Sequence, residues 1–194
     1  MASIMRVSPK SSLVHALLYL CLLVSAQVSA GKFNATIEMA SLIADKGQYK
    51  LAADVHFPLS PIAVEALQNS ISLVWNIRLK IFQQRAYLWD KELLDRTLSY
   101  RVRYHALLNM YQVKNEGNGE IRRFFSQSAA FSALGKIRNL IIVEQAQFPQ
   151  TENLWVALKV QLDREALPLP LRPIAYFDQQ WDLSSDWLQW QIEE

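Results

Sequence analysis

Metal binding or acid–base chemistry in this chain would depend mainly on His56 and His105, the two histidines outside its N-terminal segment. Asp54 shares the polar face of a predicted strand with His56, and His105 could lie on a neighbouring strand. A zinc site needs three or four ligands of the histidine, cysteine or carboxylate kind. The pattern permits a surface metal site, but it is more typical of exposed or hydrogen-bonded histidines. We expect no metal and no cofactor.

Covalent catalysis needs a nucleophile activated by a base, which a third group then orients. No serine here lies in a glycine-flanked elbow between a strand and a helix. Asp182 and Asp186 could supply paired carboxylates, but any acid-rich sequence offers such a pair. We therefore expect the protein not to be an enzyme, and a hydrolase ranks third among our functional hypotheses.

The segment 85–90 places Tyr87 and Trp89 between Arg85 and Asp90, at the exit of a predicted strand. Aromatic and arginine side chains are enriched among the anchors of protein interfaces. These four residues are therefore candidate interaction residues. An equally weighted alternative is a buried corner in which Arg85 and Asp90 pair.

A second candidate interaction surface is a basic face on two predicted strands. Its members are Arg78, Lys80, Arg101, Arg103 and His105. One interpretation is a docking surface for an acidic partner. The favoured alternative is a solvated outer face whose charges are balanced by acids on adjacent strands.

Two further segments combine proline or tryptophan with apolar residues. Residues 167–173 alternate leucine with proline and cannot form a complete strand ladder, because proline has no backbone N–H, so we expect an extended crossover that packs on the sheets. Binding of this segment to a proline-recognising groove is the weaker alternative. Trp181, Trp187 and Trp190 could stack a sugar or lipid, but core packing explains them better.

Alternation of apolar and polar residues predicts that strands position these candidates. The strongest pattern runs over 71–81, whose length indicates a central strand. A polar stretch over 83–96 separates it from the next strand, and the phase is lost after Leu107, as at a bulge. The other predicted strands are 33–43, 48–57, 98–106, 111–113, 121–125, 140–143, 154–162 and 187–192. Turns are predicted at 45–47 and 115–119, where glycine supplies positive φ.

Two short helices are predicted among these strands. Ser60 can cap one that has Pro61 in its first turn and ends at Asn69. Ser126 can cap the other, which ends at Gly135. Short helices do not provide crossovers between parallel strands, so the prediction is a mainly β fold: an antiparallel two-layer β-sandwich with two short helices. The alternative is an α+β fold with helices on one face of an antiparallel sheet.

Residues 1–30 have the three parts of a secretory signal peptide. Arg6 and Lys10 precede an apolar run from Leu13 to Val24, and small residues end at Ala30. That run is shorter than the roughly 20 residues a membrane-spanning helix needs. We expect cleavage after Ala30, a periplasmic location, and no stable membrane insertion afterwards, with residues 31–194 forming a single β-rich domain.

The remaining domain has balanced charge and no cysteine. The full chain has 20 basic and 18 acidic residues, and Arg6 and Lys10 account for the excess. Neutrality argues against nucleic acid and against an anionic membrane as partner. The single cysteine, Cys21, lies within the predicted signal peptide, so hydrophobic burial must stabilise the domain.

Landmarks spread along the chain resemble an exported proteobacterial family of unknown function, described as proline-rich signal peptide proteins. They lie at 57–60, 65–67, 85–90, 103–107 with Tyr111, 162–163, 167–168 and 181–187. The resemblance implies export and a compact domain, and it implies no activity, ligand or catalytic residue.

The leading functional hypothesis is an exported, non-enzymatic envelope protein that acts through protein–protein contacts. Its expected partner is an envelope or inner-membrane protein, bound through the candidate surfaces described above. The alternative is a periplasmic carrier of a small apolar ligand, held in a cavity lined by tryptophans.

Overall fold

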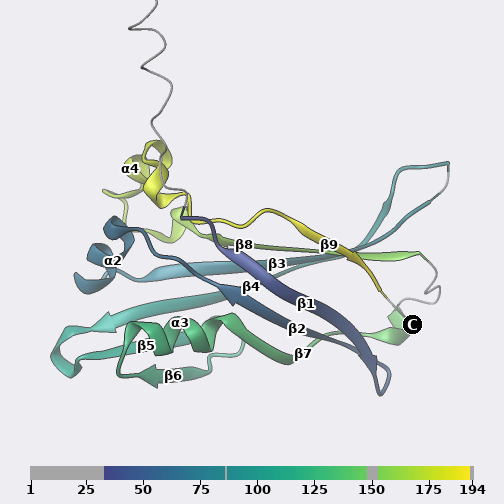
Figure 1. Ribbon diagram of the computed structural model, residues 1–194, viewed down its shortest axis with the longest axis horizontal. Coiled ribbons are helices and arrows are strands. Elements are labelled where there is room, and N and C mark those ends of the chain that lie inside the picture. The colour runs from purple at the N-terminus through teal and green to yellow at the C-terminus, as the bar shows by residue number, and fades with distance from the viewer. Residues whose placement is uncertain (1–32, 86, 148–152, 193–194) are drawn as a thin grey trace, which may run out of the picture. The chain divides into compact units, whose positions relative to one another are not determined.

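A computed structural model describes residues 33–85, 87–147 and 153–192, and the predicted signal peptide lies outside these ranges. The described residues form two antiparallel sheets (Figure 1). Sheet A has the strand order β1 (Thr36–Asp45), β2 (Gln48–His56), β7 (Lys136–Glu144). Sheet B has the order β6 (Ile121–Phe124), β5 (Met110–Asn115), β4 (Lys91–His105), β3 (Leu73–Gln83), β8 (Leu154–Leu162), β9 (Leu188–Gln191). The predicted mainly β, antiparallel two-layer architecture is confirmed.

The alternating strands of the sequence form the core between the sheets. Strand β3 lies between β4 and β8, as its predicted central position requires. Its inward side chains from Leu73 to Ile81 are fully buried, and they pack in one cluster with Tyr49 and Leu51 of β2. Each buried aliphatic side chain contributes about 1.5–3 kcal/mol. Apolar burial therefore holds the described domain together without a disulfide.

Both predicted helices are present and begin at the predicted caps. The Ser60 side chain accepts a hydrogen bond from Ala63 N at 3.2 Å, at the start of α2 (Pro61–Gln68). Ser126 does the same for α3 (Gln127–Gly135) through Ala129 N, also at 3.2 Å. A Cβ on Gly135 would lie 2.0 Å from the Val55 carbonyl oxygen, so glycine permits the close approach of α3 to β2.

Three details of the sequence-based prediction are wrong. Strand β4 begins at Lys91 rather than at residue 98, and β7 begins at Lys136 rather than at 140. The break after Leu107 is a turn of 3₁₀ helix, η1 (Ala106–Leu108), rather than a bulge. The charged start of β4 lacks a regular alternation of apolar and polar residues, because its acidic side chains form ion pairs with β3.

The proline-rich segment is also folded differently from the prediction. Leu171 N donates to Pro168 O at 2.9 Å in a turn, and a third helix, α4 (Arg172–Phe177), follows with Pro173 in its first turn. Leu167 is buried and Leu169 is exposed, so only part of the segment packs on the core. Three more 3₁₀ helices complete the described elements: η2 (Gln145–Gln147), η3 (Arg164–Ala166) and η4 (Gln179–Trp181). Within these ranges, no helix is long and apolar enough to span a membrane.

Strand β4 is longer than either of its sequence neighbours, and this determines where the candidate residues lie. Residues 91–102 pair with β3, and residues 100–105 pair with β5, so the two ladders overlap only at residues 100–102. Beside the unpaired edge, Arg96 donates to the carbonyl oxygens of Ile141 and Ile142 on β7 and links the two sheets. The two ends of β4 therefore carry two separate connections: the hairpin to β3 and the turn to β5.

Candidate functional site

The β3–β4 hairpin presents an aromatic tip to solvent. Its strands pair as far as Gln83 and Lys91, and Figure 1 shows the connecting segment running out beyond the end of the sheet. Tyr87 is 98% exposed and Trp89 is 90% exposed, with Leu88 exposed between them. Side chains of this size are normally at least half covered in a monomer. We call residues 85 and 87–90 the hairpin tip.

Arg85 holds the base of the hairpin tip. Its guanidinium donates two hydrogen bonds to the Trp89 carbonyl oxygen, from Nε at 3.1 Å and from Nη2 at 2.8 Å. Asp90 is exposed and is not the partner of Arg85. The alternative of a buried corner closed by an Arg85–Asp90 ion pair is therefore wrong. The arginine instead constrains the backbone that carries the two aromatic side chains.

Two cations in the stem of the hairpin, Arg78 and Lys80, have carboxylate partners. Arg78 binds both carboxylate oxygens of Asp95, and Lys80 Nζ lies 2.5 Å from Glu92 Oε2 and 3.5 Å from Asp95 Oδ2. The hydrogen bond from Arg78 lowers the pKa of Asp95, and the bond to Glu92 raises the pKa of Lys80. Two members of the predicted basic face, Arg78 and Lys80, thus have acidic neighbours on β4.

The other half of β4 carries the remaining candidates, Arg101, Arg103 and His105. Arg101 Nε lies 2.6 Å from Glu116, which also binds Lys114 at 3.1 Å, and the bond from Arg101 is the main cause of the lowered pKa of Glu116. His105 Nε2 lies 2.9 Å from Gln112 Oε1. Arg103 is exposed and has no ion-pair partner in the part of the chain that the structure describes.

Sequence reasoning missed a group of exposed apolar residues at this end of β4. Leu107 is 102% exposed, Leu108 65% and Phe125 83%. The turn that carries the leucines is shaped by Asn109, whose left-handed φ of 47° is accompanied by a hydrogen bond from Tyr104 Oη to Asn109 Oδ1 at 2.9 Å. The adjacent residues Phe124 and Phe125 at the end of β6 were a signal in the sequence. Consecutive strand residues point to opposite faces of a sheet, so the two phenylalanines could not both pack in the core.

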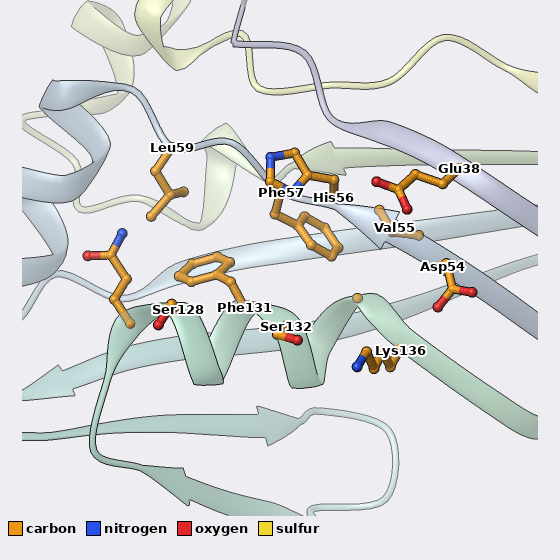
Figure 2. A pocket seen from close by; sticks show the side chains of 12 residues that line it. Glu38, Asp54, Val55, His56, Phe57, Leu59, Ser128, Phe131, Ser132 and Lys136 are labelled. Carbon is orange, nitrogen blue, oxygen red and sulfur yellow. The ribbon is translucent and has the colours of Figure 1, made fainter.

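A concave site lies elsewhere, between α3 and β2, and Figure 2 shows it. Its volume is about 440 Å³. Phe57 and Phe131 point into it, and behind them the Trp75 ring packs edge-on at 4.8 Å from the Phe57 centroid. The polar rim consists of Glu38, Asp54, His56, Gln127, Ser128, Ser132 and Lys136.

The histidines and the aspartate that were weighed as metal ligands do not meet at this site. His56 is on sheet A and His105 on sheet B, and Asp54 binds Arg138 at 2.5 Å. Across the described ranges, three or more histidine, cysteine or carboxylate side chains nowhere cluster as metal ligands would. Of the C-terminal tryptophans, Trp181 is buried in the core, while Trp187 is partly exposed with Lys159 Nζ at 5.9 Å from its ring centroid.

Fold and surface together define a two-sheet β-sandwich domain with exposed apolar side chains near both ends of β4 and a pocket beside α3. Residues 33–191 match DUF4390, a domain of unknown function, and the chain belongs to this family. Searches of curated proteins and of solved structures each found no match. The family confirms the resemblance to an uncharacterised domain, and export and proteobacterial origin stay predictions.

Proposed function

We propose that this protein is an exported, non-enzymatic envelope protein that acts through protein–protein contacts made by the hairpin tip. The observation that carries the proposal is the exposure of Tyr87 and Trp89 at 98% and 90%. Each aromatic side chain can bury about 150–250 Å² in a partner. Export follows from the signal peptide predicted at residues 1–30, and an envelope or inner-membrane protein is the expected partner.

The geometry of the hairpin favours a protein partner with an apolar pocket. Arg85 restrains the tip before binding, which reduces the conformational entropy lost on association. Arg78 and Lys80 of the stem are already paired with carboxylates, so we expect the aromatic side chains to provide most of the attraction to the partner. Tryptophan and tyrosine are the residue types most often found as binding hot spots.

In-cell crosslinking tests this proposal. The exported protein is crosslinked in its native envelope and captured species are identified by mass spectrometry, for wild type and for the double variant Tyr87→Ala/Trp89→Ala. Phe177→Ala is a matched control, because Phe177 is also 90% exposed but lies on α4. We expect one dominant envelope partner that is lost only in the double variant. Equal capture by all three proteins would remove the hairpin tip as the contact.

The pocket beside α3 supports a second candidate function, a carrier of a small apolar ligand. A volume of about 440 Å³ accommodates a compact molecule, and Phe57 and Phe131 provide its apolar wall. The tryptophan-lined cavity expected from the sequence is not this site, because its lining contains no tryptophan. Mass spectrometry of freshly purified, denatured protein should then release a stoichiometric apolar compound. Ser132→Phe, which fills the mouth, should lower its amount, and protein without any such compound would contradict the carrier function.

A further inference from the structure

At the end of sheet B opposite the hairpin tip, a row that contains two arginines is followed by exposed apolar side chains. Strand register aligns Arg103, Gln112 and Arg123 in one row across β4, β5 and β6. The next row on the same face contains His105 and Met110, and Phe125 directly follows β6 beside them. Leu107 and Leu108 extend this end further through the β4–β5 turn. We call these residues the arginine–leucine end.

The two arginines of the row have charges that the domain does not neutralise. Neither Arg103 nor Arg123 has an ion-pair partner among the described residues, whereas Arg78 and Arg101 each bind a carboxylate. With strands about 4.8 Å apart, the two guanidinium-bearing positions lie about 10 Å from each other. Arginine binds phosphate oxygens through paired N–H donors, so the row is complementary to a surface carrying several phosphate groups.

Beyond this row, the apolar side chains form a convex tip. Leu107, Leu108 and Phe125 are 102%, 65% and 83% exposed. Phe125 comes two residues after Arg123, and the two leucines follow Arg103 in the β4–β5 turn. A protein partner would need a matching hollow for three projecting side chains. A fluid lipid surface accepts them without one, with the apolar groups below the headgroups and the cations at phosphate level.

We propose that the arginine–leucine end docks this protein peripherally on an anionic lipid surface. Leu107, Leu108 and Phe125 enter the boundary of the acyl layer, and Arg103 and Arg123 bind lipid phosphates. Neutral net charge had argued against an anionic membrane, but charge concentrated within one Debye length of the surface is sufficient for local attraction. The proposal does not depend on the hairpin tip, which lies at the other end of β4.

Vesicle co-sedimentation tests the proposal with the exported protein purified from cells. Wild type should bind vesicles that contain phosphatidylglycerol, bind phosphatidylcholine vesicles weakly, and be released by high salt. The variant Leu107→Ser/Phe125→Ser should reduce binding by about tenfold or more, as expected for removing two inserted apolar groups. Arg103→Gln/Arg123→Gln should reduce it several-fold and abolish the preference for phosphatidylglycerol.

Phe177→Ser is the control, because it removes an exposed aromatic side chain on α4, outside both the hairpin tip and the arginine–leucine end. It should leave vesicle binding unchanged, and the thermal unfolding midpoints of all variants should stay close to wild type because every changed side chain is exposed. The proposal is overturned if wild type does not bind phosphatidylglycerol vesicles, or if the control and the arginine–leucine variants lose binding equally. Loss of a crosslinked envelope protein in those variants, without vesicle binding by wild type, would instead assign this end to a protein partner.

Discussion

The two ends of strand β4 both expose large apolar side chains, but they differ in how their charges are satisfied. At the hairpin tip, Tyr87 and Trp89 lie beyond a stem in which Arg78 and Lys80 have carboxylate partners on the neighbouring strand. At the arginine–leucine end, Leu107 and Phe125 lie beyond Arg103 and Arg123, which have no such partners in the described residues. Exposure alone would not distinguish these surfaces.

We infer from this difference that the charges around an exposed apolar group determine whether the group fits a protein pocket or a lipid surface. Cations that are already paired with carboxylates, as Arg78 and Lys80 are, attract phosphate less, and the aromatic side chains beyond them fit a preformed protein pocket. Unpaired arginines add attraction to an anionic surface, and aliphatic side chains partition into acyl chains. One strand thus connects two surfaces that could act together, one on a lipid layer and one on a protein partner.

The largest expected effect is on affinity for the protein partner, which should fall for changes at the hairpin tip and not for changes at the arginine–leucine end. Tyr87→Ala/Trp89→Ala should weaken binding of the crosslinked partner by about 100-fold or more, since truncating two hot-spot residues costs at least about 2 kcal/mol each. Leu107→Ala/Phe125→Ala should leave that affinity within a few-fold of wild type. Affinity is measured with the isolated partner by titration calorimetry. If both pairs weaken capture alike, the two ends form one interface.

Removing carboxylates from the hairpin stem should increase the affinity of the hairpin for anionic lipid, the property that we propose for the arginine–leucine end. Glu92→Gln/Asp95→Asn removes the carboxylates that neutralise Arg78 and Lys80. With two free cations below an aromatic tip, this variant should bind phosphatidylglycerol vesicles several-fold more tightly than wild type, because each free cation near such a surface is worth about 1 kcal/mol. Co-sedimentation at low and high salt measures the gain. Unchanged binding would show that unpaired charge is not what distinguishes the two ends.

Releasing the base of the hairpin tip should have a smaller effect. Arg85→Ala removes two hydrogen bonds to the Trp89 carbonyl oxygen while both aromatic side chains remain. Each net hydrogen bond is worth about 1 kcal/mol, so partner affinity should fall by about tenfold through lost restraint. Arg85→Lys, which keeps the charge but loses the two-pronged geometry, should recover little. Full affinity in Arg85→Ala would mean that the tip needs no restraint.

The smallest effect concerns how the stability contributed by the Arg78–Asp95 ion pair depends on pH. The pKa of Asp95 is lowered in the folded protein by its hydrogen bond from Arg78, so the stabilisation it provides is complete above the unfolded-state pKa. It is lost as pH falls through the lower, folded-state pKa. Wild type should therefore unfold at a slightly higher temperature than Asp95→Asn at neutral pH, and the difference should disappear in acid. Calorimetry at several pH values checks this, and a difference that persists in acid would contradict it. The pair is exposed, so the shift should be small.

Much of the fold could be predicted because local rules and the global structure agree there. Strands β2, β3 and β8 have clear alternation, since one face of each packs in the core. Ser60 and Ser126 could be identified as caps because capping depends only on residues within one helical turn. The candidate hairpin residues were also found from sequence, although their solvent exposure was left open against a buried corner.

The parts that were missed depend on strand pairing or on a second conformation that the same residues allow. The first half of β4 lacks a hydrophobic period because Glu92 and Asp95 pair with β3 across the sheet. Helix α4 was missed because the prolines of segment 167–173 indicated an extended segment, although Pro173 also fits the first turn of a helix. Phe125 was hidden because only strand register places it next to His105 and Met110.

The sequence by itself determined the class of fold, the central strand, the helix starts and which residue types were available for contacts. Those features follow from side-chain periodicity and from hydrogen bonds between near neighbours, which the order of residues specifies directly. Only the tertiary structure decided which cations are neutralised and which apolar side chains gather at one end of β4. Both depend on pairing between strands, beyond the reach of contacts within one helical turn, because a carboxylate such as Glu116 can neutralise Arg101 only where the fold places them within a few ångströms.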